Sequence, residues 1–312
     1  MRLSLVLMTL FAAACSSTLP TAPAKSVAFP IAAPEFTNIV DVSEVWRDER
    51  RGRDVPVKIY AAADARAPLP VVVFSHGIGE NRDSYEWLGR ALAQHGFLTV
   101  HVTHAGTDRA VLDRGYLHLY RAVKQPENWI NRPLDVTFVL DRLASRADAD
   151  MTRVAAVGHS AGAFTAFALA GLRTADGKTL RDSRVKVAIP MSMPRLGDVV
   201  PPNGYDAIEI PVLNMTGTRD TSLIYRTFPR HRRIPFEQSR APRQYLVTLE
   251  GATHNSFVLE DARRDAIVAL TVAFLRAHLR DDASARRWFD EAGRAEIAKV
   301  GIYIERKNDA AR

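Results

Sequence analysis

The chain has 312 residues, of which 47% are hydrophobic and 25% are charged, a balance typical of a folded globular protein and not of a disordered or collagen-like chain. Its net charge of +7 would suit an anionic partner, but no zinc-finger spacing, RNP-like stretch or basic heptad array is present, so we expect no nucleic-acid binding. The single cysteine, Cys15, excludes an intramolecular disulfide, a thiolate metal cluster and a cysteine nucleophile in the body of the protein.

Residues 1–15 predict a signal peptide that ends like the lipobox of bacterial lipoproteins. Arg2 precedes a short apolar run that is too short to span a bilayer, and three alanines stand directly before Cys15, although Ala12 occupies the position where leucine is usual. We expect an exported protein whose Cys15 carries a lipid that holds it on a membrane, facing the periplasm or the cell exterior. The alternative is an ordinary secretory signal with Cys15 incidental. Residues 16–36 are rich in Ser, Thr, Ala and Pro and predict a flexible tether.

Strands alternate with helices over residues 37–281, which we interpret as one domain. Two strand-like runs, 38–48 and 53–61, predict an antiparallel hairpin. Further strands are predicted at 71–75, 97–103, 153–157, 185–189, 211–215 and 244–249, and helices at 83–95, 133–146, 161–172 and 262–280. Loops are predicted at 104–125, 191–206 and 221–242, where we expect the pocket walls, and residues 282–312 form a charged tail without an assigned role. The alternation predicts an α/β fold with a mostly parallel central sheet and helices on both faces.

The pattern G-x-S-x-G occurs at Gly158-His159-Ser160-Ala161-Gly162, between a predicted strand and a predicted helix. In that setting it is typical of a nucleophile elbow, a turn so sharp that the residues two before and two after the serine crowd each other. Gly158 and Gly162 are therefore expected to be needed for the turn. Ser160 is the predicted nucleophile at a helix N-terminus, and the alternative is a glycine-rich turn in which Ser160 only caps the helix.

A serine nucleophile needs a base and an acid that orients the base. His254 follows the predicted strand 244–249 and is the predicted base. Asp220 follows the predicted strand 211–215, which we expect to lie beside that strand, and is the predicted acid. Weaker candidates for the acid are Asp198, Asp206 and Glu250, whereas Asp135 and Asp141 are predicted to be solvated on a helix. Among the other histidines, His76 and His159 are interpreted as structural, His101 and His104 as candidates to line a pocket, and His95, His118, His231 and His278 as surface or partly buried residues.

Two backbone N–H groups are predicted to form an oxyanion hole, which stabilises the negative charge of a tetrahedral intermediate. One belongs to Ala161, directly after the nucleophile. The other belongs to Ile78, in the loop after strand 71–75, where Gly77 allows a close approach of the backbone. We expect no metal and no organic cofactor.

Four segments in this order resemble the motifs of an α/β-hydrolase of the serine esterase type: the His76-Gly77 loop, the elbow at Ser160, the turn ending at Asp220 and the loop ending at His254. More closely, the chain is similar to the dienelactone-hydrolase-related group, with its platelet-activating-factor acetylhydrolase-like and cutinase-like enzymes. The resemblance spans residues 71–278 and implies the α/β-hydrolase fold and ester hydrolysis. It departs in three respects. True dienelactone hydrolases use a cysteine nucleophile, and polyester hydrolases carry aromatic residues where this chain has Ile78 and residues 190–193. The segment 205–243 has no assignable counterpart.

The sequence therefore predicts a serine carboxylic-ester hydrolase that forms an acyl-enzyme with small to medium acyl esters. An amidase or peptidase with the same triad is one alternative, and a surface lipoprotein that binds a small molecule without turnover is another. The basic residues within 230–243 are interpreted as part of a solvated loop rather than a lid or a basic rim. The sequence does not indicate the oligomeric state.

Overall fold

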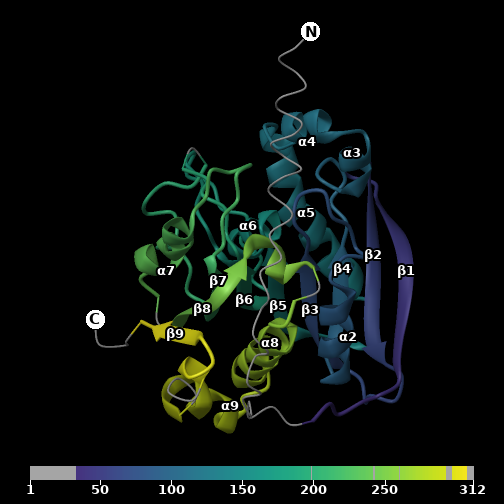
Figure 1. Ribbon diagram of the computed structural model, residues 1–312. Coiled ribbons are helices and arrows are strands. Elements are labelled where there is room, and N and C mark those ends of the chain that lie inside the picture. Colours follow the sequence, from purple (N-terminus) through teal and green to yellow (C-terminus); the bar gives the residue numbers. More distant parts are fainter. Residues whose placement is uncertain (1–32, 198, 242, 260, 293–296, 308–312) are drawn as a thin grey trace.

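One sheet runs through the residues that the computed structural model describes, which are 33–197, 199–241, 243–259, 261–292 and 297–307 (Figure 1). Within them the strand order is β1-β2-β4-β3-β5-β6-β7-β8-β9. The strands from β4 to β8 pair in parallel, whereas β1 with β2, β2 with β4, and β8 with β9 pair antiparallel. The predicted parallel sheet that begins with a hairpin is confirmed. The predicted signal peptide, Cys15 and most of the predicted tether lie outside the described residues.

The strands and helices have the following bounds. The strands are β1(Ile39–Asp48), β2(Arg53–Ala62), β3(Leu69–Ser75), β4(Leu98–Val102), β5(Ala149–His159), β6(Val185–Met191), β7(Val212–Arg219), β8(Gln244–Thr253) and β9(Ile302–Arg306). The helices are α2(Glu86–Gln94), α3(Arg109–Asp113), α4(Tyr116–Ala122), α5(Pro126–Leu143), α6(Ala161–Ala170), α7(Ile234–Gln238), α8(Arg264–Leu279) and α9(Ala283–Arg287), with the short helical turns η2(Pro229–Arg233), η3(His254–Phe257) and η4(Trp288–Ala292). No helix in the described residues is long and apolar enough to cross a membrane.

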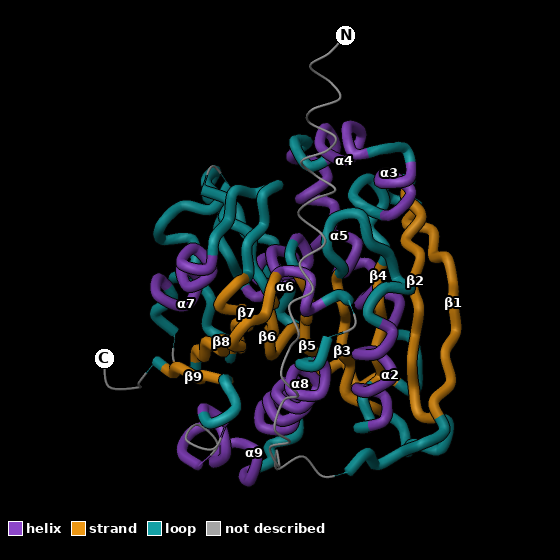
Figure 2. The backbone as a smooth tube through the Cα atoms, in the orientation of Figure 1, coloured by secondary structure: helices purple, strands orange, loops and turns teal. Residues whose placement is uncertain are grey.

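The core lies on both faces of the sheet. Because side chains alternate along a strand, Val71 and Val73 of β3 pack with α5 and α6, whereas Val72 and Phe74 pack with α2 and α8. A strand covered on both faces needs apolar residues at every position, which is the continuous run that identified β3 in the sequence. The loops after β6 and β7 gather beyond the carboxyl ends of these strands, at the upper left of Figure 2.

The predicted loop 104–125 is largely helical, which corrects the sequence interpretation. It contains α3 and α4, each too short to show a clear hydrophobic period. The apolar spacing in the sequence predicts a helix that begins at Pro133. Helix α5 begins instead at another proline, Pro126, and continues through Pro133.

The prediction that residues 282–312 form only a charged tail is wrong, because part of this segment is a strand of the sheet. Strand β9 pairs antiparallel with β8 from Tyr245↔Arg306 to Leu249↔Ile302 and extends the sheet. Ile302 and Ile304 are buried, whereas Tyr303 between them is exposed. This alternation is typical of a strand, but it is only three residues long and is followed by charged residues, so the sequence pattern alone does not identify β9. The folded unit therefore continues past residue 281.

Candidate active site

The turn at Ser160 joins β5 to α6 and has the geometry of a nucleophile elbow. Ser160 has φ 56° and ψ −116°, a conformation that costs a non-glycine residue about 1–3 kcal/mol. A β-carbon at Gly158 would overlap the backbone of Gly162, and one at Gly162 would overlap the carbonyl oxygen of Ser75. These two glycines are therefore required for the turn, and the contact with Ser75 sets the elbow against the loop after β3.

The structure brings Ser160, His254 and Asp220 together in one chain of hydrogen bonds. His254 Nε2 lies 3.1 Å from Ser160 Oγ, and His254 Nδ1 lies 3.0 Å from Asp220 Oδ1. Asp220 follows β7 and His254 follows β8, and these strands are parallel neighbours as expected. With Nδ1–H donating to the carboxylate, Nε2 can accept the Ser160 proton. The arrangement can thus remove a proton from a serine hydroxyl.

Asp220 is fully buried and has several other partners. The hydroxyls of Ser192 and Thr216 donate to its Oδ2 at 2.6 and 2.9 Å, and Arg232 Nη2 lies 2.9 Å from its Oδ1. Burial favours the neutral carboxyl, but the hydrogen bond with His254, the charge of Arg232 and the Ser192 hydroxyl outweigh it and hold the pKa of Asp220 well below its usual range. Asp220 is therefore an anion over the pH range in which a histidine base can act.

The interpretation of residues 230–243 as a solvated loop is wrong, because the segment is partly helical and Arg232 within it is buried. This part of the chain forms η2 and α7, and Arg232 is only 2% exposed. Its guanidinium donates to the carbonyl oxygens of Ser192 and Met193, both at 2.7 Å, besides pairing with Asp220. It also lies 3.1 Å from His254 Nδ1, a contact without a hydrogen bond when the Nδ1 proton is directed at Asp220. Arg230 and Arg240 of the same segment are exposed.

Sequence reasoning missed Ser192, Thr216 and Arg232. Ser192 follows β6 directly, and side chains that follow neighbouring parallel strands meet at the same sheet edge, so its position in the sequence was an available signal. Thr216 lies within β7, four residues before Asp220. No local pattern distinguishes Arg232 from the other arginines around it, because its burial depends on how the loop folds back over Asp220.

A pocket of about 160 Å³ opens beside Ser160 and His254. The residues that line it come from four segments, 77–85, 159–160, 222–225 and 254–258. Gly77 and Ile78 are among them, and Ala161 is the first residue of α6. Both predicted oxyanion donors therefore belong to segments next to the nucleophile. Among the described residues of the three loops expected to form the walls, those that line the pocket all belong to 221–242.

Several other histidine and aspartate candidates are buried and lie outside the Ser160–His254–Asp220 chain of hydrogen bonds. Asp135 was expected to be solvated, but it is fully buried and binds Arg51, Arg53 and His104. His101 and His104 are buried and do not line this pocket. His159 is also buried, and its Nδ1 lies 2.7 Å from the Tyr85 hydroxyl.

Neither of the rival acids that the structure describes lies in the hydrogen-bond chain. Asp206 pairs with Arg240, and Glu250 lies near the Tyr303 hydroxyl. Asp198 lies outside the described residues, and Asp141 is exposed, as expected. The described residues contain no group of three or more His, Cys, Asp or Glu side chains placed to hold a metal ion.

Comparison with known proteins adds one match. The family model named Chlorophyllase matches residues 40–189, just under half of the chain, from β1 into β6. The matched part includes Ser160 but neither Asp220 nor His254. Chlorophyllases form an ester-hydrolase family, whereas comparison with curated proteins gives no match. The mostly parallel sheet, the elbow at Ser160 and the match to this family together identify the chain as an α/β-hydrolase of the serine esterase type, similar to the chlorophyllase family over residues 40–189.

Proposed function

We propose that the chain hydrolyses carboxylic esters of small to medium acyl groups through a Ser160–His254–Asp220 triad and an acyl-enzyme. The observation that carries the proposal is the continuous chain of hydrogen bonds from Ser160 Oγ through His254 to a buried, ionised Asp220, placed at the wall of a pocket. A role in binding alone would need neither this chain nor the strained turn at Ser160.

The reaction follows from the placement of these groups. Ser160 Oγ attacks the ester carbonyl carbon while its proton moves to His254 Nε2, and Asp220 stabilises the imidazolium that results. The backbone N–H groups of Ile78 and Ala161 bind the oxyanion, helped by the positive end of the α6 dipole. The tetrahedral intermediate then collapses, and the alcohol leaves with the proton from His254. Water, activated by His254, attacks the acyl-enzyme in the same way and releases the carboxylic acid.

The size of the pocket sets the expected acyl group. A cavity of about 150 Å³ accommodates a group the size of benzene, and this pocket has about 160 Å³. Its apolar lining includes Ile224 and Val258. The next residues in the chain, Leu223 and Leu259, are 65% and 58% exposed. We therefore expect a longer acyl chain to extend out of the pocket toward these exposed leucines.

For p-nitrophenyl esters from C2 to C12, we expect kcat/KM to rise with chain length up to about C6. The rise should be no more than about fourfold per methylene, because burying one CH₂ contributes about 0.8 kcal/mol, which corresponds to about a fourfold change. Beyond that length we expect a plateau, because the added methylenes lie outside the pocket. Replacing Ile224 by asparagine should lower kcat/KM more for C8 and C12 than for C2. A sharp fall after C4 in the wild-type protein would contradict this view of the pocket.

The same triad could cleave amides, so the matched p-nitroanilide is measured beside each ester. The ratio of ester to amide turnover by the enzyme is compared with the ratio of the two uncatalysed hydrolysis rates. An enzymatic ratio no larger than the uncatalysed one would favour the amidase alternative. Absence of turnover on every ester and amide, with a folded protein, would favour a protein that only binds its ligand.

We also propose that the protein is exported and that a lipid on Cys15 anchors it to a bacterial membrane. The support is the sequence pattern alone, an apolar run that ends in three alanines directly before the single cysteine. Expression in a bacterial host with an alkyne fatty acid should label the wild-type protein and leave Cys15→Ser unlabelled and released from the membrane. Equal labelling of the two proteins would contradict the anchor.

A further inference from the structure

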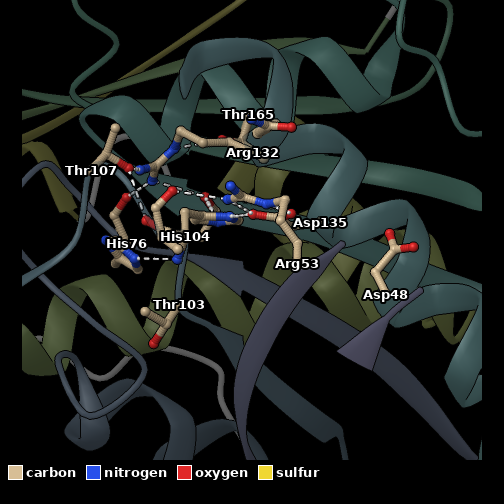
Figure 3. Close-up of polar contacts among 12 residues, drawn as sticks. Asp48, Arg53, His76, Thr103, His104, Thr107, Arg132, Asp135 and Thr165 are labelled. Carbon is tan, nitrogen blue, oxygen red and sulfur yellow. Dashed lines mark hydrogen bonds and ion pairs between the residues drawn. The ribbon is translucent and has the colours of Figure 1, made fainter. Parts of the chain in front are cut away.

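The loop that follows β3 is bound to a buried polar network that the proposed reaction does not use (Figure 3). The network contains His76, His104, Arg132 and Asp135, each at most 1% exposed. They come from the loop after β3, the loop after β4 and helix α5, three segments far apart in the sequence. Burying two charged and two imidazole side chains is costly unless each is paired, so the cluster requires a physical explanation.

The protonation of His76 follows from its two partners. The backbone N–H of His104 donates to His76 Nε2 at 3.0 Å, so this nitrogen carries no proton. The proton is therefore on Nδ1, which lies 2.5 Å from the carbonyl oxygen of Gly77 and donates to it. Burial, followed by the charge of Arg132, holds the pKa of His76 well below its usual range. A neutral ring with one defined tautomer thus binds the Gly77 carbonyl.

This bond also fixes the orientation of the next N–H group. In a trans peptide the carbonyl of one residue and the N–H of the next point in opposite directions. Holding the Gly77 carbonyl on the His76 ring therefore directs the Ile78 N–H to the other side of the loop. Gly77, Ile78 and Ser160 line the same pocket, and Ile78 N–H is the oxyanion donor of the proposed function.

The backbone on either side of this peptide is held as well. Arg132 donates to the carbonyl oxygen of His76 and, at 2.7 Å, to the hydroxyl of Thr107. The Gly79 N–H donates to the carbonyl oxygen of Thr107 at 2.8 Å. The loop therefore has fixed hydrogen bonds before and after Ile78, and little freedom is left for the peptide between them.

The His104 side chain connects the end of β3 to helix α5 by hydrogen bonds. Arg132 donates to Ser75 Oγ at 3.2 Å, and the Ser75 hydroxyl donates to His104 Nε2 at 2.9 Å. His104 Nδ1–H then donates to Asp135 at 3.1 Å. Asp135 also accepts from Arg51 at 2.7 Å and from Arg53 at 3.0 Å, so its charge is balanced. Burial and the charge of Arg132 lower the pKa of His104 to about 4, which keeps its ring neutral near pH 7.

We propose that His76, supported by His104 and Asp135, is a positioning residue that orients the Gly77–Ile78 peptide for binding of the oxyanion. The inference rests on the proposed function, because it assigns a role to the same oxyanion donor. The buried network is then the reason that this N–H is in place before the substrate arrives, which is the condition under which a donor stabilises a transition state most.

The test uses two substitutions that each keep half of the His76 contacts. An asparagine amide lies near the position of Nδ1, so His76→Asn keeps a donor for the Gly77 carbonyl and loses the acceptor for the His104 N–H. A glutamine amide lies near the position of Nε2, so His76→Gln keeps the acceptor and loses the donor. His95→Gln is the matched control. His95 is also buried, but it lies just before the amino end of β4, whereas the active site lies beyond the carboxyl ends of the strands.

Each protein is assayed with a p-nitrophenyl ester and its thiono analogue, in which sulfur replaces the carbonyl oxygen. Sulfur is a weak hydrogen-bond acceptor, so an oriented N–H speeds the oxygen substrate more than the sulfur one. The ratio of the two kcat/KM values does not depend on the fraction of active enzyme. We expect the ratio to fall about 10- to 100-fold in His76→Gln, with little change in KM, and to stay near the wild-type value in His76→Asn and His95→Gln.

An unchanged ratio in His76→Gln, or an equal fall in His76→Asn and His76→Gln, would overturn the inference while leaving the proposed function intact. Ser160→Ala is measured in the same series. If the wild-type turnover of either substrate persists in Ser160→Ala, the proposed function fails, and this inference fails with it.

Discussion

Replacing Ser160 by alanine is expected to lower kcat for ester hydrolysis by about 10⁶-fold, because removal of the nucleophile from a serine triad costs about as much as removal of the whole triad. KM should change little, since Ser160 Oγ contributes little to the binding of the ground state. The measurement is steady-state hydrolysis of p-nitrophenyl butyrate, with a fluorophosphonate to titrate the nucleophile. Mass spectrometry should locate the phosphonate on Ser160 of the wild-type protein.

Ser160→Gly is the matched control for folding. It removes the same hydroxyl and also relieves the strain of φ 56° at this position. We expect it to be as inactive as Ser160→Ala and to unfold at a temperature no lower than that of the wild type. Turnover above about 1% of wild type in both variants would show that another residue attacks the ester, since a missing nucleophile should cost far more.

Replacing Asp220 by asparagine is expected to lower kcat about 10⁴-fold, because an amide in place of the carboxylate favours the wrong tautomer of the histidine base. It should also destabilise the fold by about 3–5 kcal/mol, since it leaves the buried Arg232 guanidinium without its anion. Both effects follow from one carboxylate that binds His254 and Arg232 through the same oxygen, at 3.0 and 2.9 Å. Urea unfolding and ester turnover measure them separately.

The double variant Asp220→Asn with Arg232→Met separates the two roles of Asp220. Removing the uncompensated cation should restore much of the lost stability but none of the lost turnover. Recovery of turnover in the double variant would show that the unpaired arginine, and not the tautomer of His254, caused the loss. Equal stability of Asp220→Asn and the wild type would show that Arg232 does not depend on Asp220.

The same experiment has a defined pH dependence. The folded pKa of Asp220 lies below its unfolded value, which is about 3.9 for an aspartate. The stability that the carboxylate contributes is therefore fully present above that unfolded value and is lost as the pH falls through the folded value. The difference in stability between wild type and Asp220→Asn should shrink as the pH falls below about 4.

The sequence determined the parts of this protein that depend on local chemistry. The order of strands and helices could be predicted because buried parallel strands need continuous apolar runs and helices need a 3.6-residue period. The elbow at Ser160 could be predicted because only glycine fits two residues to each side of so sharp a turn. Asp220 and His254 could be assigned because both directly follow strands that were expected to be neighbours, and loops after neighbouring parallel strands meet at one sheet edge.

Only the tertiary structure decided which charged groups are buried. Asp135 and Arg232 have the same sequence character as the solvated charges around them, and nothing local distinguishes them. Their burial is favourable only because distant segments supply partners, Arg51, Arg53 and His104 for one and Asp220 with two carbonyl oxygens for the other. The energy of a buried charge depends on such pairing across the fold, and a single sequence does not reveal which distant residues will meet.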